Sequence, residues 1–288
     1  TVSPDASMAD FREVLRANRI SGTPVVENGK MVGIVSIEDL IKALVEGKGD
    51  VRVSERMTPE VVTLRAEASV IEAVKKTGCR GVGVDIDAEL IAASESRARA
   101  AGVDGRVRFV RQDFFETDIR EATVMLIYLF THVNIRLRPK FLSEMKPGSR
   151  LVSHAFDLGD WKPDLSTRVG SRQVHFWLIP ANATGTWTWS VPGSRQAAFV
   201  LQIEQKYQQI RGTLTQGDHP STLTDAKLTG DRITFRVEQD VPGVKTTREF
   251  AGTVEGNEIS GTIVSTDGAG VQNSRWKAVR DPSTLRPV

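Results

Sequence analysis

The first 60 residues alternate apolar segments of helical spacing with short continuous apolar runs. Helical spacing occurs twice, first at Met8, Phe11, Val14 and Leu15 and again at Leu40, Ile41, Leu44 and Val45. Between these segments, Thr23-Pro-Val-Val and Met31-Val-Gly-Ile-Val flank a turn with the sequence Asn28-Gly29. Because Asn-Gly between apolar runs is a strong hairpin signal, this block predicts a helix, a hairpin and a helix in a small α/β unit.

Residues 61–183 predict strands and helices in alternation. The expected strands are apolar runs at Val61–Leu64, Val82–Val84, Val107–Val110, Val124–Leu129 and Leu151–Ala155. Helical segments separate them, and the clearest is Ala88–Ala101 with its repeated Ala, Glu and Arg. Continuous apolar strands that alternate with helices are typical of a parallel, doubly wound sheet.

Residues 184–288 show no helical spacing and alternate apolar and polar positions with period two. The alternation covers Gly185–Ser190, Phe199–Ile203, Ile233–Val237 and Glu258–Val264, with two-residue turns at Gly230-Asp231 and Gly256-Asn257. This pattern predicts an antiparallel β meander or small barrel whose interior holds Trp187, Trp189, Phe199, Phe235 and Trp276. A weak internal echo occurs in Ile210-Arg-Gly-Thr, Phe250-Ala-Gly-Thr and Ile259-Ser-Gly-Thr.

The three patterns divide the chain into an α/β unit over 1–60, a sheet-forming domain over 61–183 and a β domain over 184–288. At roughly 100–200 residues per domain, the length of 288 residues suggests two domains and permits three. Hydrophobic residues make up 40% and charged residues 26%, which is the composition of a folded globular protein. The predicted fold class is α/β with a C-terminal β extension.

Charge and composition narrow the set of partners. The formal net charge is only +2, so no domain-wide basic field is available to bind nucleic acid. The longest apolar runs, such as Val124–Phe130, are far shorter than the roughly 20 residues that cross a bilayer. The first residues lack the basic and apolar segments of a signal peptide, and the single Cys79 excludes an intramolecular disulfide. We expect a cytoplasmic protein without nucleic-acid or membrane partners.

Two segments of the first block resemble a cystathionine-β-synthase-type (CBS) domain. They are Ser21-Gly-Thr-Pro-Val-Val-Glu and Gly33-Ile-Val-Ser-Ile-Glu-Asp-Leu. The resemblance implies that an adenine nucleotide, AMP or ATP, contacts Ser36 and Asp39 through its ribose, with Thr23 and Pro24 in the neighbouring wall. Residues 53–64 resemble the start of a second CBS repeat, and this second repeat ends before its hairpin. A complete CBS pair would therefore need another chain, which implies a homodimer.

Helix capping is the alternative for Ser36 and Asp39, and it is the interpretation that we favour. Ser36-x-x-Asp39 places a hydroxyl before a helix and an acid three residues later, which is the pattern of a capping box. The same pattern occurs at Ser7-x-x-Asp10 and Ser69-x-x-Glu72. A CBS fold does not by itself establish a nucleotide site.

From about Val70 onward, the chain resembles class I S-adenosylmethionine-dependent methyltransferases. The resemblance rests on the segment 73–87, on Val110-Arg-Gln-Asp-Phe-Phe and on Lys146-Pro-Gly-Ser-Arg-Leu-Val-Ser-His. Two further segments, Ser153-His-Ala-Phe and Gly159-Asp-Trp-Lys-Pro-Asp, resemble a bacterial subgroup related to protein-lysine methyltransferases. A class I methyltransferase would bind S-adenosylmethionine at the carboxyl ends of its parallel strands.

This resemblance assigns cofactor contacts to four residues. Asp85 closes the second strand and would accept hydrogen bonds from both ribose hydroxyls, while Ile86 covers one face of the adenine. Asp113 would face the adenine amino group, with Phe114 beside it. The alternative in each case is structural, because Asp85 and Asp87 can cap the following helix and Asp113 can lie in a turn.

The methyl acceptor, a protein lysine by the same resemblance, is expected at the carboxyl ends of the next two strands. Phe130 and Thr131 would bind it, and His132 and His154 are the candidate catalytic residues, with His154 as a proton acceptor. A structural histidine is the default alternative for each. No metal site is expected, because the spacing of the four histidines is not that of metal ligands. They are His132, His154, His175 and His219.

One family motif is missing from the chain. The family has an Asp-x-Gly-x-Gly-x-Gly loop after its first strand, whose glycines let the backbone approach the methionine part of the cofactor. The corresponding stretch, Val61–Val74, contains no glycine and fits a CBS repeat better, so the junction looks chimeric. We therefore expect a methyltransferase-like protein with impaired cofactor binding. The alternative is a non-enzymatic module that senses adenine nucleotide or assembles through its CBS segment.

Overall fold

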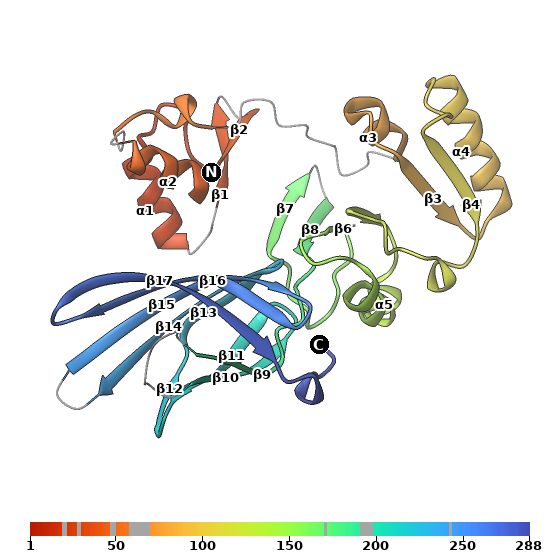
Figure 1. The fold of residues 1–288 in the computed structure, drawn as a ribbon. Helices are drawn as coiled ribbons and strands as arrows, with labels where there is room; N and C mark the ends of the chain where they lie inside the picture. Colours follow the sequence, from red (N-terminus) through yellow and green to blue (C-terminus); the bar gives the residue numbers. More distant parts are fainter. Residues whose placement is uncertain are drawn as a thin grey trace. The chain divides into compact units, whose positions relative to one another are not determined.

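The predicted helix, hairpin and helix open the computed structural model (Figure 1). Helix α1 (Met8–Asn18) precedes the antiparallel strands β1 (Gly22–Glu27) and β2 (Lys30–Ser36), and α2 (Ile37–Val45) and the 3₁₀ turn η1 (Val53–Glu55) follow. The structure describes residues 1–18, 22–27, 30–46, 50–57, 70–169, 172–190, 198–241 and 244–288. The predicted Asn28-Gly29 turn lies outside the described residues.

The two helices differ in how they pack. Met8, Phe11 and Leu15 of α1 are buried in one core with residues of both strands, as the helical spacing predicts. On α2, Leu40 is buried in the same core, but Ile41 and Leu44 are exposed. Only one stripe of α2 therefore faces the hairpin, and part of its apolar surface does not.

Helices and strands alternate from α3 to β6, as predicted, but two further strands, β7 and β8, then follow without a helix between them. The elements are α3 (Val70–Thr77), β3 (Gly81–Asp85), α4 (Ala88–Ala100), β4 (Val107–Arg111), η2 (Phe114–Glu116), β5 (Val124–Ile127), α5 (Thr131–Glu144), β6 (Arg150–His154), β7 (Leu165–Val169) and β8 (Arg172–Leu178). Strand β3 pairs with β4, while β5 pairs in parallel with β6, and β8 and β7 extend that second sheet in antiparallel order.

Each of these two sheets has an edge strand with exposed apolar side chains. In the part of the chain that the structure describes, β3 pairs only with β4, and at one end of its sheet β5 pairs only with β6. Val82 of β3 and Val124 and Leu126 of β5 are exposed, although such side chains are buried in a complete doubly wound sheet. The predicted strand Val61–Leu64 lies outside the described residues.

The C-terminal block forms one antiparallel sheet of nine strands. They are β9 (Gly185–Trp189), β10 (Phe199–Lys206), β11 (Gln209–Gln216), β12 (His219–Thr222), β13 (Thr224–Thr229), β14 (Arg232–Val241), β15 (Val244–Glu255), β16 (Glu258–Asp267) and β17 (Gly270–Arg280), followed by the 3₁₀ turn η3 (Pro282–Thr284).

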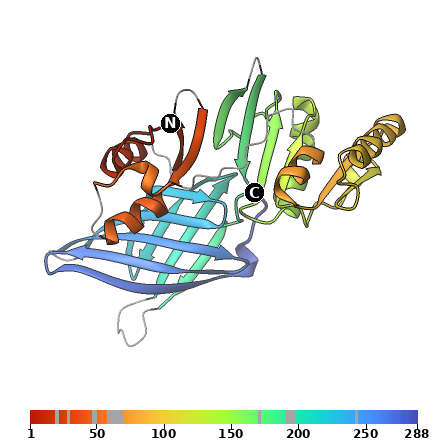
Figure 2. The ribbon, with the colours of Figure 1, turned by 90° about the horizontal axis from the view of Figure 1, so that it is seen from above.

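This sheet is a meander that curls into a near-barrel. Its strand order is β12-β11-β10-β9-β17-β16-β15-β14-β13, so the first and last strands pair and the sequence neighbours β12 and β13 form the two edges. Seen from above, the blue strands β14–β17 lie across the teal strands of the first half (Figure 2). The predicted meander is therefore confirmed, and it curls into a near-barrel in which the edge strands β12 and β13 are not paired with each other.

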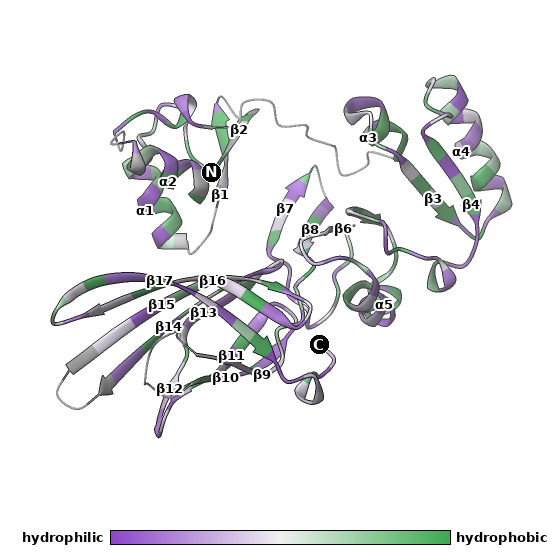
Figure 3. Cartoon of the chain, in the orientation of Figure 1, coloured by the Kyte–Doolittle hydropathy of each residue, from purple (hydrophilic) through white to green (hydrophobic). Residues whose placement is uncertain are grey.

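The barrel interior follows from the period-two pattern. Figure 3 shows hydrophilic and hydrophobic residues alternating along its strands. All five aromatic residues predicted to lie inside are buried in one cluster, namely Trp187, Trp189, Phe199, Phe235 and Trp276. The two predicted glycine turns are also confirmed, because the strand pairs close around them at Thr229↔Arg232 and Glu255↔Glu258.

The chain forms two compact units. The first comprises residues 1–82 and 95–108, and the second comprises residues 83–94 and 109–288. The second unit thus contains the carboxyl end of β3, the sheet β5-β6-β8-β7 and the whole near-barrel. The domain boundaries predicted after residues 60 and 183 stay predictions.

Candidate functional site

The predicted ribose-binding carboxylate lies at the end of a parallel strand pair. Asp85 is the last residue of β3, and its carbonyl accepts a hydrogen bond of 3.0 Å from the backbone N–H of Gln112, just beyond β4. Its Oδ1 accepts a second one, of 2.9 Å, from the backbone N–H of Asp87. Ile86 follows with 70% of its surface exposed. A half-buried carboxylate and an exposed apolar side chain therefore stand together at this strand end.

Asp87, two residues further on, caps the following helix. Its Oδ1 accepts hydrogen bonds of 2.8 Å from Glu89 N and 3.4 Å from Leu90 N at the start of α4. This is the geometry of a helix N-cap. Of the two acidic residues for which capping was the alternative, Asp87 therefore fills that role, whereas Asp85 accepts a hydrogen bond from the backbone N–H of this cap residue and none from the helix itself.

Asp113 and Phe114 come directly after β4 and are both in structural contacts. Asp113 is exposed and caps η2, because its Oδ1 accepts a 2.9 Å hydrogen bond from Phe115 N. Phe114 is half-buried and its ring lies 6.3 Å from that of Phe141 in α5. The turn geometry foreseen for Asp113 is present, and adenine contacts of both residues stay predictions.

Aromatic side chains gather at the carboxyl ends of β5 and β6. The ring of Phe130 stacks on His132 with 5.9 Å between centroids and meets Phe156 edge-on at 5.1 Å. Tyr128 lies 5.0 Å from His154 and 5.7 Å from Phe156. These five residues form what we call the aromatic cluster, which joins three of the predicted site residues to two that the sequence did not single out.

The turn after β6 fixes the position of Phe156 in the aromatic cluster. Ala155 adopts a positive φ of 67°, and the hydroxyl of Ser153 donates a 2.5 Å hydrogen bond to the carbonyl of Phe156. The buried Asn134 of α5 donates to Asp157 O at 3.2 Å. Tyr128 and Phe156 were missed because the rings meet across two strands. Their only sequence signal is an aromatic residue just past each strand end.

Two buried polar atoms near this turn have no hydrogen-bond partner among the described residues. They are Nε2 of His154 and Oδ1 of Asn134. Both side chains stand at the carboxyl side of the sheet, on β6 and in the first turn of α5. Unpaired buried polar atoms are uncommon in native proteins, so these atoms are available to a bound group. Thr131 begins α5 beside them.

The predicted nucleotide residues of the first block form a helix cap. Ser36 N and Ser36 Oγ each donate to Oδ2 of Asp39 at 2.8 Å, and Asp39 N donates to Ser36 Oγ at 3.4 Å. Thr23 is buried, and the side chain of Pro24 lies outside the described part. The capping box that the sequence favoured is thus present. A nucleotide role for these residues stays a prediction.

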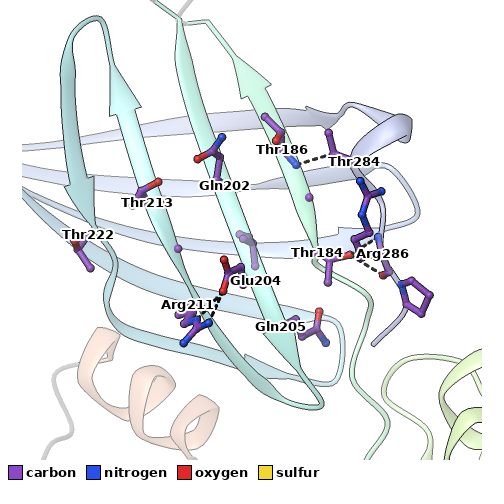
Figure 4. A pocket seen from close by; sticks show the side chains of 14 residues that line it. Thr184, Thr186, Gln202, Glu204, Gln205, Arg211, Thr213, Thr222, Thr284 and Arg286 are labelled. Carbon is purple, nitrogen blue, oxygen red and sulfur yellow. Dashed lines mark hydrogen bonds and ion pairs between the residues drawn. The ribbon is translucent and has the colours of Figure 1, made fainter.

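A cavity of about 690 Å³ opens on the outer face of the near-barrel (Figure 4). It is lined by hydroxyl and amide side chains of β9, β10 and β11 together with Arg286 of the C-terminal segment. None of the residues predicted for methyl transfer lines it. Among the described residues, no group of acidic, histidine and cysteine side chains could hold a metal ion, and no helix is long and apolar enough to cross a membrane.

A parallel β-α-β unit with acidic residues at the carboxyl ends of neighbouring strands is typical of doubly wound nucleotide-binding domains. Matches to two protein families narrow this class further. Residues 68–165 match the ANTKMT methyltransferase domain, and residues 1–46 match the CBS domain. Two segments of the chain are therefore similar to a CBS domain and to a methyltransferase domain, as the sequence indicated, and the near-barrel follows them.

Two relatives are similar to part of the chain, and both are lysine methyltransferases. The chain is 45% identical over 84 residues to a protein-lysine N-methyltransferase of Saccharolobus islandicus, which is 29% of this chain and 52% of that protein. It is 24% identical over 120 residues to the adenine nucleotide translocase lysine N-methyltransferase of Mus musculus, 41% of this chain and 52% of the relative. The chain thus spans about half the length of each of these relatives.

A solved structure is also similar in sequence. An RNA methyltransferase from Salinibacter ruber in complex with S-adenosyl-L-homocysteine is 39% identical, with 43% of this chain and 76% of that chain covered and a TM-score of 0.38.

Proposed function

We propose that the chain is an S-adenosylmethionine-dependent methyltransferase whose acceptor is a protein lysine. The observation that carries this proposal is the pair Asp85 and Asp113, which follow neighbouring parallel strands inside the segment that matches the methyltransferase family. The lysine acceptor is supported by the activity of the Saccharolobus islandicus relative, a protein-lysine N-methyltransferase.

The residues at the end of β3 fit the adenosine half of the cofactor. One oxygen of Asp85 is bonded to a backbone N–H, and an ionised carboxylate has further acceptor sites for the ribose hydroxyls. The exposed Ile86 offers an apolar surface to one face of the adenine. Asp113 would accept from the adenine amino group. When bound, the cofactor supplies a methyl group that is activated by a positively charged sulfur.

The aromatic cluster suits a lysine side chain. Tyr128, Phe130 and Phe156 present ring faces and edges, which bind the methylene stem and attract the ammonium group through cation–π contacts. A lysine must lose a proton before its nitrogen can attack a methyl group. Nε2 of His154, buried and unpartnered among the described residues, is positioned to accept that proton, directly or through a water molecule. His132, stacked on Phe130, is exposed and would orient the acceptor.

We also propose that cofactor binding is weakened by the junction before α3. The stretch that corresponds to the family's glycine-rich loop contains Arg65, Glu67 and Ser69 and no glycine. These residues lie outside the described part of the chain, and the proposal rests on the sequence alone: side chains would compete with the methionine part of the cofactor for space that glycines leave open. Restoring a glycine-rich loop should strengthen binding by more than about tenfold, or about 1.4 kcal/mol.

Two measurements on the full chain test these proposals. Calorimetric titration with S-adenosylmethionine measures binding, and transfer of a tritiated methyl group to polylysine measures activity, with fully acetylated polylysine as the matched control. We expect measurable but weak binding, with label on polylysine only. Micromolar binding by the unaltered chain would contradict the weakened site. Label on RNA instead of polylysine would contradict the lysine acceptor.

The second candidate function is adenine-nucleotide sensing or assembly through the CBS segment, and the family match of residues 1–46 favours it. Exposed apolar residues of α2 at spacings of four and three, Ile37, Ile41 and Leu44, would pair with a second copy in a homodimer. Binding of AMP or ATP without S-adenosylmethionine would favour this function. We propose a cytoplasmic location for either function.

A further inference from the structure

Four of the five residues of the aromatic cluster lie on two segments that meet each other. Phe130 and His132 stand at the start of α5, while His154 and Phe156 stand at the end of β6 and in the turn after it. Phe130 meets Phe156 edge-on with the ring centroids 5.1 Å apart, so the two segments are the walls of the cluster. Any group that ties the turn to α5 therefore sets the distance between these walls.

The carbonyl groups of the turn are bonded by side chains. The pairing of β6 with β8 ends at His154, and Ala155 N still donates to Gln173 O at 2.7 Å. Ala155 takes a φ of 67°, and the next two carbonyls, those of Phe156 and Asp157, accept hydrogen bonds from buried side chains. A residue other than glycine keeps a positive φ only where the surrounding structure fixes it. The side chains that bind these two carbonyls therefore stabilise the turn.

A single amide of α5 serves both carbonyls. Asn134 is fully buried in the first turn of α5, and its Nδ2 donates to Asp157 O at 3.2 Å and to Ser153 Oγ at 3.4 Å. The hydroxyl of Ser153, also fully buried, donates in turn to Phe156 O at 2.5 Å. Hydrogen bonds in such a chain polarise and strengthen one another. Asn134 therefore ties two successive carbonyls of the turn to α5, one directly and one through Ser153.

Two further contacts hold the chain after the turn against the same helix. Gly159 packs so closely on Ile135 that a Cβ atom at this glycine would lie 3.0 Å from Ile135 Cδ1. Arg138, one turn further along α5, forms an ion pair with Asp160. Both contacts act on residues beyond the turn, whereas Asn134 bonds within it. The amide of Asn134 is thus the contact with α5 that lies nearest to the residues of the aromatic cluster.

We propose that Asn134 is a positioning residue for the acceptor site, which fixes the distance between the two walls of the aromatic cluster. This inference rests on the proposed function, in which the cluster binds a lysine side chain and His154 accepts its proton. Both interactions depend on geometry, and a displacement of about 1 Å can slow a reaction by about a hundredfold. The candidate cofactor residues Asp85 and Asp113 follow β3 and β4 instead. Loss of Asn134 should therefore slow methyl transfer without weakening the binding of S-adenosylmethionine.

The first test measures the cluster in the full chain without any activity. The Tyr128 ring, 5.0 Å from the ring of His154, shifts the NMR signal of the His154 Cε1 proton, and single substitutions of each histidine by Gln assign the signals. At a fixed pH, Asn134→Leu should move the His154 signal toward that of an unstructured histidine and leave that of His219 in the near-barrel unchanged. Ser153→Ala, which removes only the relay, should move it less and covers the case that Asn134→Leu does not fold. An unmoved His154 signal would overturn the proposal.

The second test measures methyl transfer to polylysine. Asn134→Leu should lower kcat at least about tenfold, while its affinity for S-adenosylmethionine changes by less than about twofold. Asn182→Leu is the matched control, since its amide donates to Arg286 O of the C-terminal segment, and it should leave kcat unchanged. An unchanged kcat of Asn134→Leu in an active protein, or the same loss in Asn182→Leu, would contradict a positioning role. If the wild type transfers no methyl group, the proposed function fails, and the NMR signals decide whether Asn134 holds the walls of the cluster together.

Discussion

Trp161 and Tyr207 stack face to face, with ring centroids 5.3 Å apart and planes inclined by 14°. Trp161 follows β6 in the methyltransferase segment and is fully buried, whereas Tyr207 lies in the turn between β10 and β11 of the near-barrel. The indole N–H of Trp161 also donates to Gln208 Oε1 at 2.9 Å. The barrel therefore contributes part of the core beneath the methyltransferase sheet.

The same turn reaches helix α5, whose first residues belong to the candidate acceptor site. Arg138 of α5 donates to the Tyr207 hydroxyl at 2.7 Å and forms an ion pair with Asp160. Lys206 approaches Asp160 from the barrel side at 2.9 Å. Because α5 begins at Thr131, between Phe130 and His132 of the aromatic cluster, the turn is positioned to hold that helix in place.

Tyr207 variants test this link. Tyr207→Phe keeps the stacking but loses the hydroxyl contacts, so it should lower the free energy of unfolding by about 0.5–1.5 kcal/mol. Tyr207→Ala also loses the ring and should cost about 3 kcal/mol. Thermal melts of both proteins measure these differences. Equal costs for the two variants would mean that the ring packing is unimportant.

Truncation after Ala183 tests whether the methyltransferase segment folds without the barrel. Removal of Tyr207 and Gln208 leaves Trp161 without its stacking partner and its hydrogen-bond acceptor. We expect the free energy of unfolding of this segment to fall by at least about 3 kcal/mol. Uncovering the ring of Trp161 removes packing contacts much as the truncation of a large core side chain does. Urea unfolding followed by circular dichroism at the helix band measures this. A truncated chain as stable as the same segment in the full protein would contradict the prediction.

Acid should weaken the contact between the barrel and α5. Hydrogen bonds from Lys206 and Arg138 hold the pKa of the Asp160 carboxyl well below its usual range. The unfolded chain therefore takes up this proton first as the pH falls, so the stabilisation is complete above about pH 4 and fades below it. The melting-temperature difference between the wild type and Asp160→Asn should shrink from about pH 7 to about pH 3. A constant difference would contradict this. Burial raises the pKa of Asp164. Because Asp164 is present in both the wild type and Asp160→Asn, its contribution cancels in the difference between their melting temperatures.

Local pattern predicted the elements well but not all of their partners. Helical spacing and period-two alternation are properties of neighbouring residues, so α1, α4 and the barrel strands could be located from the sequence. The pairing of β9 with β17, which curls the meander into a near-barrel, joins residues about ninety positions apart, such as Thr188 and Val279. No local signal encodes that contact.

The candidate site shows the same division. The acidic residues at the end of β3 were evident from the sequence, but only the hydrogen bonds separate Asp87, which caps α4, from Asp85, which does not. Phe156 enters the aromatic cluster because Ala155 takes a positive φ, a conformation that alanine rarely adopts. The sequence therefore could not predict that ring's position.

Asp85 and Asp87 provide a matched pair of variants. Asp85→Ala should weaken binding of S-adenosylmethionine or S-adenosylhomocysteine by about tenfold or more, because hydrogen bonds to a carboxylate contribute about 1.5–3 kcal/mol. Asp87→Ala removes the cap of α4 and should instead cost about 1 kcal/mol of stability. Calorimetry and thermal melts on both variants distinguish the two roles. Equal effects on binding would indicate that Asp85 is structural.

The glycines of the repeated Gly-Thr segments, the internal echo in the sequence, lie where neighbouring strands of the barrel approach closely. A Cβ atom at Gly212 or Gly261 would lie 1.9 Å from the carbonyl oxygen of Gln202 or Ala251, and Gly252 is paired with Gly261 across β15 and β16. The repeated Gly-Thr therefore marks places where neighbouring backbones approach too closely for any side chain.

Gly261→Ala tests this interpretation against a matched control. The added methyl group meets backbone atoms, which cannot rotate away, so neighbouring strands must separate and stability should fall by at least about 2 kcal/mol. Gly268 lies on the turn after β16, and a Cβ there would meet nothing within 4 Å, so Gly268→Ala should be neutral. Each kcal/mol corresponds to a fall of roughly 2–4 °C in the melting temperature. If the two variants melt together, close strand approach is not what holds glycine at position 261, and the echo has no structural cause in this barrel.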